Sequence, residues 1–211
     1  MKNMRINQNF ISMLDKLNIT AILKSFSLVS FANIIKLVIS FVCIKLIAIM
    51  LGPSGVALIG QLNNFVAMIM SFSGGGIMTG ITKYVAENRD SEERSKDYIS
   101  TAFRITIYFS LTIGLLLVLL HDFISRKVLL SPDYGPVFIL FGSTLFLYAL
   151  NTMILCLLNG YQELRKYVIV NLSGSSIGLF LTLLLIFPFG LIGAMISIVT
   201  TQSITFFVSC W

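Results

Sequence analysis

Two lysines interrupt an apolar stretch near the start of the chain. Residues 33–55 read NIIKLVISFVCIKLIAIMLGPSG, and Lys36 and Lys45 are the charged residues within it. A charged side chain at the centre of a membrane span costs about 2.5–3.5 kcal/mol on insertion scales, so it is expected to face protein or water. An ionisable residue inside a membrane span is by default a candidate for a functional site. Because nine residues correspond to about 900° of helical rotation, the two lysines leave a helix on opposite sides.

Lys36 is the stronger candidate of the two. Counted from the predicted start of the first span, Lys36 lies about 15 Å deep, near the midplane, and Lys45 about 28 Å deep, near the far surface. A lysine near the surface can extend its ammonium group to water, whereas one at the midplane cannot. Asn33 shares the helix face of Lys36. In the next span, Asn63 and Asn64 are expected at about the depth of Lys45.

Small residues follow in the second span. The segment SFSGGG, residues 71–76, is expected at about the depth of Lys36, and GIMTG, residues 76–80, has a small-xxx-small spacing. Consecutive glycines let two helices approach closely or break a helix so that it faces a ligand, and the sequence alone leaves both interpretations open.

The elements that carry these residues are predicted to be membrane-spanning helices. Of the 211 residues, 56% are hydrophobic and 11% are charged, and the mean hydropathy is +0.92. A soluble domain carries about a quarter charged residues. Runs of about 20 apolar residues, the length that crosses a bilayer as a helix, predict an all-α polytopic membrane protein with six transmembrane helices. We expect these spans near residues 26–50, 58–82, 103–121, 136–158, 168–187 and 191–211.

A leader at residues 1–22 precedes the transmembrane part, residues 23–211. Its apolar residues recur at helical spacing with polar residues between them, which favours an amphipathic helix in the plane of the cytoplasmic membrane surface. A poorly ordered leader, or a translation start at Met13, is the alternative.

The positive charges predict the orientation. Lysines and arginines number four before the first span, five between the second and third spans, and two between the fourth and fifth, whereas the opposite connections carry Arg126 and Lys127 alone. Because cytoplasmic loops retain positive charge, eleven against two places the N-terminus in the cytoplasm. The net charge of +6 is therefore mostly a matter of topology. No basic soluble face is left for a nucleic-acid partner.

Catalytic and metal-binding patterns are missing from the sequence. Cys43, Cys156 and Cys210 all fall inside predicted spans without the spacing of metal ligands, and we interpret them as packing residues. His121 stands beside Asp122 at the end of the third span, where an interfacial role is expected. There is no Ser/His/Asp set, HExxH motif or phosphate loop. We therefore expect no enzyme activity, no cofactor and no metal.

Several motifs resemble one family of membrane transporters. IAIMLGPSGVALIGQLNNF and GGGIMTGITKYVAEN, followed more weakly by NGYQELRKY, look like the opening of the O-antigen and enterobacterial-common-antigen type flippases, which belong to the multidrug/oligosaccharidyl-lipid/polysaccharide exporter superfamily. The resemblance implies a bacterial inner-membrane protein that moves an undecaprenyl-pyrophosphate-linked oligosaccharide to the periplasmic leaflet. It also implies two six-helix lobes that alternate in access, of which this chain would form one. The implied partners are the lipid-linked glycan, membrane lipid, and the polysaccharide polymerase and chain-length proteins.

The resemblance also assigns roles to individual residues. Lys36 would meet the pyrophosphate midway across the membrane, because a pyrophosphate in a low-dielectric interior needs a compensating charge. Lys45, with Asn63 and Asn64, would serve the outward-facing end. At the cytoplasmic ends of the second and third spans, Lys83 and Arg104 would collect the headgroup, and Asn33 would line the cavity beside Lys36.

The length of the chain and the residues expected for ion coupling leave alternative functions open. Members of the resembled family have twelve or more spans, so the chain is expected to be a fragment or truncated product, or to work as two assembled copies. A cation-coupled multidrug-type antiporter would have the same architecture but would be expected to carry carboxylates inside the membrane. A non-transporting subunit of a polysaccharide assembly complex would fit a short chain, and Lys36 would then need a carboxylate partner.

Overall fold

The computed structural model describes residues 19–87 and 92–211, and every regular element in these ranges is helical. This confirms the predicted all-α fold. The predicted leader at residues 1–22 lies outside the described residues, apart from residues 19–22. The elements are α2 (Ile19–Met70), the π-helix η1 (Ser71–Gly75), α3 (Gly76–Glu87), α4 (Glu92–Leu119), α5 (His121–Val128), the 3-10 helix η2 (Pro132–Tyr134), α6 (Gly135–Gly160) and α7 (Leu164–Ser209).

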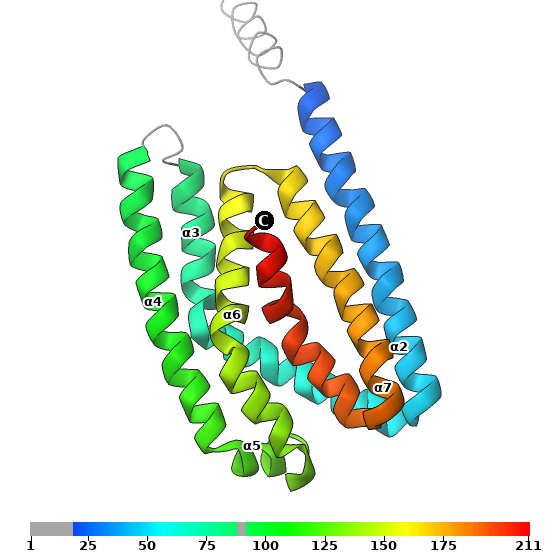
Figure 1. The fold of residues 1–211 in the computed structure, drawn as a ribbon. Helices are drawn as coiled ribbons and strands as arrows, with labels where there is room; N and C mark the ends of the chain where they lie inside the picture. Colours follow the sequence, from blue (N-terminus) through cyan, green and yellow to red (C-terminus); the bar gives the residue numbers. More distant parts are fainter. Residues whose placement is uncertain (1–18, 88–91) are drawn as a thin grey trace, which may run out of the picture.

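The two longest helices, α2 and α7, are each interrupted by a glycine. Gly52 has φ 70° and ψ −175° and is followed by Pro53, and Gly190 has φ 55° and ψ −127° two residues after Pro188. A side chain at either position would be strained, because L-residues rarely adopt positive φ. Figure 1 shows the chain changing direction sharply at both breaks. They coincide with the GPSG and PFG segments that separate predicted spans.

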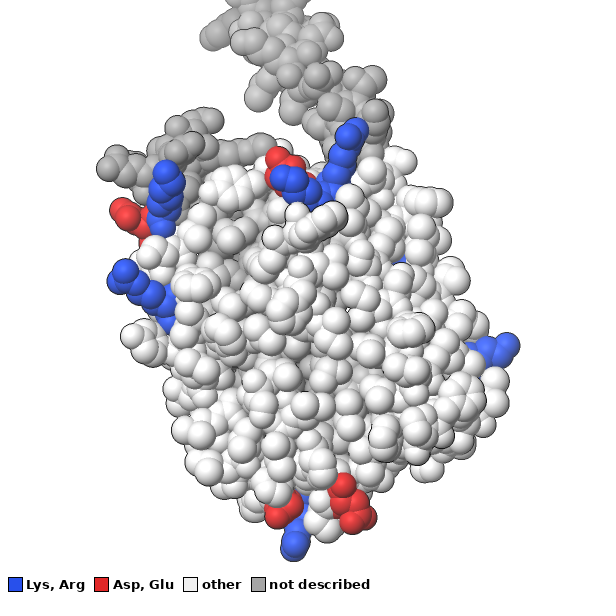
Figure 2. All heavy atoms as spheres, viewed as in Figure 1, with Lys and Arg blue, Asp and Glu red and all other residues white. Residues whose placement is uncertain are grey.

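Four helical segments are long and apolar enough to cross a membrane. These segments are Ser27–Gly74, Lys96–Leu119, Pro132–Gly160 and Leu164–Ser209. The first and the last contain the breaks at Gly52 and Gly190. The six-span count itself stays a prediction. In Figure 2 most charged side chains lie at the two ends of the molecule, and few are seen on the visible face between them, as expected for a protein that crosses a bilayer.

A π-helical turn joins α2 to α3 within the predicted second span. This turn, η1, contains the first glycines of SFSGGG, so the helix does break there. Gly74 also lies close to α4, because a Cβ built on it would stand 3.6 Å from Thr106 Oγ1. The break is therefore observed, and Gly74 is in ordinary contact with α4, whereas a ligand-facing role for the segment stays a prediction.

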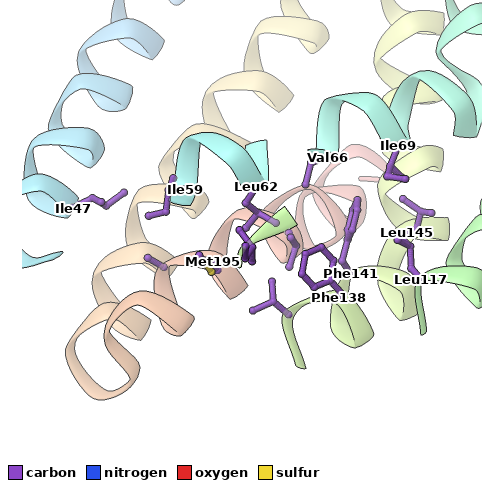
Figure 3. Packing of buried hydrophobic residues seen from close by; sticks show 14 of the residues in the cluster. Ile47, Ile59, Leu62, Val66, Ile69, Leu117, Phe138, Phe141, Leu145 and Met195 are labelled. Carbon is purple, nitrogen blue, oxygen red and sulfur yellow. The ribbon is translucent and has the colours of Figure 1, made fainter. Parts of the chain in front are cut away.

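The core lies where α6 packs against α4 and α7, and side chains of α2, which packs against α7, complete it. Phe138 and Phe141 of α6, Leu62 of α2 and Met195 of α7 are fully buried there (Figure 3). Phe65 meets Phe138 edge to face, with ring centroids 5.4 Å apart. A smaller cluster ties α3 to α4 and α6 through Met78, Ile81, Val85, Ala102 and Met153. This packing holds both halves of α2 and of α7 around one cavity.

Candidate functional site

A cavity of about 360 Å³ lies between α2, α6 and α7. Lys36 and Asn63 reach it from the two halves of α2, and Tyr148 reaches it from α6. Asn171 and Gln202 reach it from the two halves of α7. The breaks at Gly52 and Gly190 make this possible, because each lets one long helix contribute two walls.

The wall from the first half of α2 is one helix face. Lys36, Ser40, Cys43 and Ile47 all line the cavity, and their spacing of four, three and four residues places them on one side of a helix. Lys36 is exposed rather than buried. Among the described residues, no carboxylate forms an ion pair with its ammonium group. The cavity therefore receives a lysine whose charge is not offset by a protein carboxylate within its described walls.

The wall from the first half of α7 is lined by small and polar residues. Asn171, Gly174, Ser175, Gly178 and Thr182 line the cavity, and they recur at steps of three and four residues, so they share one face. The two glycines also let the halves of α7 approach each other. A Cβ on Gly174 would stand 3.1 Å from the side chain of Thr205, and one on Gly178 would stand 3.2 Å from that of Thr201.

The hydroxyl groups that line the cavity from both halves of α7 mostly donate their protons to carbonyls of their own helix. Ser175 donates to the carbonyl of Asn171 at 3.0 Å, Thr205 donates to that of Thr201 at 2.8 Å, and Thr201 donates to that of Ser197 at 2.5 Å. A hydroxyl has one proton and two lone pairs. These side chains are therefore left as hydrogen-bond acceptors, suited to ligand O–H or N–H groups.

The structure brings two of the predicted site residues together. Lys36 and Asn63 line the cavity, whereas the five other candidates are exposed and do not line it: Asn33, Lys45, Asn64, Lys83 and Arg104. Lys45 lies on the opposite side of the helix from Lys36, as the spacing of nine residues predicts. Near the end of α3, Lys83 Nζ stands 3.8 Å from Glu87 Oε1, an exposed pair that contributes little to stability. The roles of all seven residues stay predictions.

Sequence reasoning missed the part of the site that α7 and α6 supply. The signal was present in NLSGSSIG, residues 171–178, where polar and small residues recur on one helix face inside an apolar span. Gln202 and Tyr148 carried no comparable pattern. Cys43, interpreted as a packing residue, also lines the cavity. His121 lies in α5 with its Nδ1 3.0 Å from Asp122 Oδ1, away from the cavity.

The described helices form an all-α lobe, with apolar segments long enough to cross a membrane, around a cavity that Lys36 lines. A solved structure titled as the outward-facing conformation of a multidrug resistance MATE family transporter of the MOP superfamily has this fold, with a TM-score of 0.71, 17% identity, and a match that covers 89% of this chain and 44% of that one.

The chain belongs to the polysaccharide biosynthesis protein family, which matches residues 22–211. This confirms the resemblance found in the sequence. Two relatives are each named Lipid III flippase, one from Escherichia coli (strain K12) and one from Shigella flexneri. Each is 27% identical over 134 residues, which cover 64% of this chain and 32% of the relative. The match thus spans about a third of the length of these relatives.

Proposed function

We propose that this chain is one lobe of a bacterial inner-membrane flippase that moves an undecaprenyl-pyrophosphate-linked oligosaccharide, such as an O-antigen or related repeat unit. The observation that carries the proposal is Lys36, which lines the cavity without a carboxylate partner among the described residues. The family and the name of its relatives, Lipid III flippase, support it.

The cavity suits both chemical parts of such a substrate. A pyrophosphate carries negative charge, and a preplaced ammonium group stabilises it without reorganisation in a low-dielectric interior. The sugar part carries hydroxyl groups, which can donate to the acceptor oxygens of Ser175, Thr201 and Thr205. Lys36 is thus proposed to hold the pyrophosphate, and the α7 wall to hold the glycan.

The other predicted residues are proposed to act at the two membrane surfaces. The charge asymmetry of the connections supports a cytoplasmic N-terminus. Lys83 and Arg104, both exposed, would then collect the headgroup on the cytoplasmic side, and Lys45 with Asn63 and Asn64 would receive it on the other. A second lobe, from a longer protein or from a second copy, would be needed to alternate access around the site.

Two alternative functions find less support in the cavity. A cation-coupled antiporter would be expected to place Asp or Glu in the site, and the described residues that line the cavity include neither. An accessory subunit would be expected to pair Lys36 with a carboxylate, and the described residues provide none within ion-pair distance.

The proposal is tested by complementation. The chain is fused to the second lobe of a related flippase and expressed in a flippase-null strain, and surface polysaccharide is measured. Lys36→Met should abolish the polysaccharide because it removes the charge and spares the packing, whereas Lys36→Arg should keep part of it. Lys127→Met, which removes an exposed lysine outside the cavity, is the matched control. Full polysaccharide with Lys36→Met would refute the proposed role of the charge.

A further inference from the structure

One cavity residue is held by a buried polar side chain on another helix. Asn151 of α6 is fully buried, and its Nδ2 donates to Oε1 of Gln202 in α7 at 2.7 Å. Its own Oδ1 accepts a hydrogen bond from the Ser209 hydroxyl. Both ends of this buried amide are engaged, and rotating it would set its oxygen against Oε1 of Gln202, acceptor against acceptor, which defines its orientation.

The hydrogen bond from Asn151 determines which end of the Gln202 amide faces the cavity. Gln202 lines the same cavity as Lys36 and is half-buried. Because its Oε1 accepts from Asn151, that oxygen is directed at α6, and the NH₂ group, which makes no hydrogen bond within the described part of the chain, is the end left for a ligand. A side-chain amide in this orientation offers two donors and no free acceptor on that side. Donors are what a phosphate oxygen requires.

The hydroxyl groups of α7 around Gln202 indicate what kind of ligand group it would meet. The hydroxyls of Ser175, Thr201 and Thr205 donate to backbone carbonyls of their own helix, so they face the cavity as acceptors. Gln202 stands among these acceptors as a donor. A donor within an acceptor wall marks a place where the ligand itself presents an acceptor.

We propose that Asn151 is a positioning residue, which orients the Gln202 amide so that its N–H groups join Lys36 in binding the pyrophosphate. This rests on the proposed function. Asn151 does not line the cavity and acts through Gln202. A positioned amide binds more tightly than one free to rotate, since no side-chain freedom is lost on binding.

The test measures the affinity of the 211-residue chain, in lipid nanodiscs, for geranyl pyrophosphate by thermophoresis. Gln202→Leu should raise the Kd about tenfold, as expected for the loss of one hydrogen bond to a charged group. Asn151→Leu should raise it about three- to tenfold. In the double variant the Asn151 change should have no further effect, because its partner is already gone. Asn151→Ser serves if Asn151→Leu does not fold.

Ser203→Ala is the matched control. Ser203 is buried and donates across the same two helices, to the carbonyl of Thr144 at 3.0 Å, but does not line the cavity. Its removal should leave the Kd unchanged, so a general loosening of α6 against α7 would be recognised by a rise in this control.

The outcomes separate the inference from the function on which it rests. If the wild-type chain binds and Lys36→Met does not, while Asn151→Leu or Asn151→Ser binds like the wild type, the positioning role is refuted and the proposed function stands. Additive effects of Asn151→Leu and Gln202→Leu, or an equal loss in Ser203→Ala, would also overturn the positioning role. Failure of the wild-type chain to bind geranyl pyrophosphate would overturn both.

Discussion

Substituting alanine for Gly142 should weaken the contact between α4 and α6. A Cβ on Gly142 would stand 2.6 Å from the carbonyl oxygen of Gly114, and one on Gly114 would stand 2.5 Å from the carbonyl oxygen of Gly142. Ordinary contact begins at 3.4 Å, so the helices would have to separate by roughly 0.8 Å, enough to lose a quarter or more of the dispersion energy at the crossing. Overpacking of this kind costs about 1–3 kcal/mol.

Gly60→Ala is the matched control for Gly142→Ala. A Cβ on Gly60 would have no atom within 4 Å, and alanine gains helix propensity over glycine by about 1 kcal/mol in both variants. Thermal unfolding in detergent, followed by far-ultraviolet circular dichroism of the helices, compares the two. At about 2–4 °C per kcal/mol for a chain of this length, Gly142→Ala should melt about 2–12 °C below Gly60→Ala. Equal melting temperatures would refute the close helix crossing.

The remaining predictions concern the two breaks and the topology. Gly52→Ala and Gly190→Ala should each lower the free energy of unfolding by about 1–3 kcal/mol. Backbone strain alone is the cause, because a Cβ at either position meets nothing within 4 Å. A melting temperature equal to that of Gly60→Ala would contradict the positive φ. On a cysteine-free background, Lys166→Cys should react with an impermeant thiol reagent from the cytoplasm and Ser54→Cys from outside. Labelling of both from one side would refute the orientation.

Sequence predicted the elements because their causes are local. Helix length follows from the thickness of hydrocarbon, and the breaks at Gly52 and Gly190 fall where a glycine stands within two residues of a proline. Lys36 was found by the same local reasoning, since the cost of a buried ammonium group depends on depth and is readable along one span.

The packing between helices could not be predicted from the sequence in the same way. In a membrane both the lipid-facing and the protein-facing sides of a helix are apolar, so hydrophobicity does not distinguish fully buried Phe138 from exposed Phe180. The crossing at Gly114 and Gly142 joins residues of two helices, and nothing in the sequence of either segment identifies the other as its packing partner. The hydrogen bond from Asn151 to Gln202 joins residues fifty-one positions apart, so it depends on how α6 packs against α7 and not on any local sequence pattern.

The binding of a prenyl pyrophosphate by Lys36 tests the central claim most directly. The wild-type chain, Lys36→Met and Lys127→Met are each placed in nanodiscs, and their affinity for geranyl pyrophosphate is measured beside that for geraniol, which lacks the charge. We expect the wild type and Lys127→Met to bind the pyrophosphate, and Lys36→Met to bind it at least about tenfold more weakly, as the loss of a charge-assisted hydrogen bond implies. Equal affinity of Lys36→Met and the wild type, or equal affinity for geraniol, would contradict the claim that Lys36 holds the pyrophosphate.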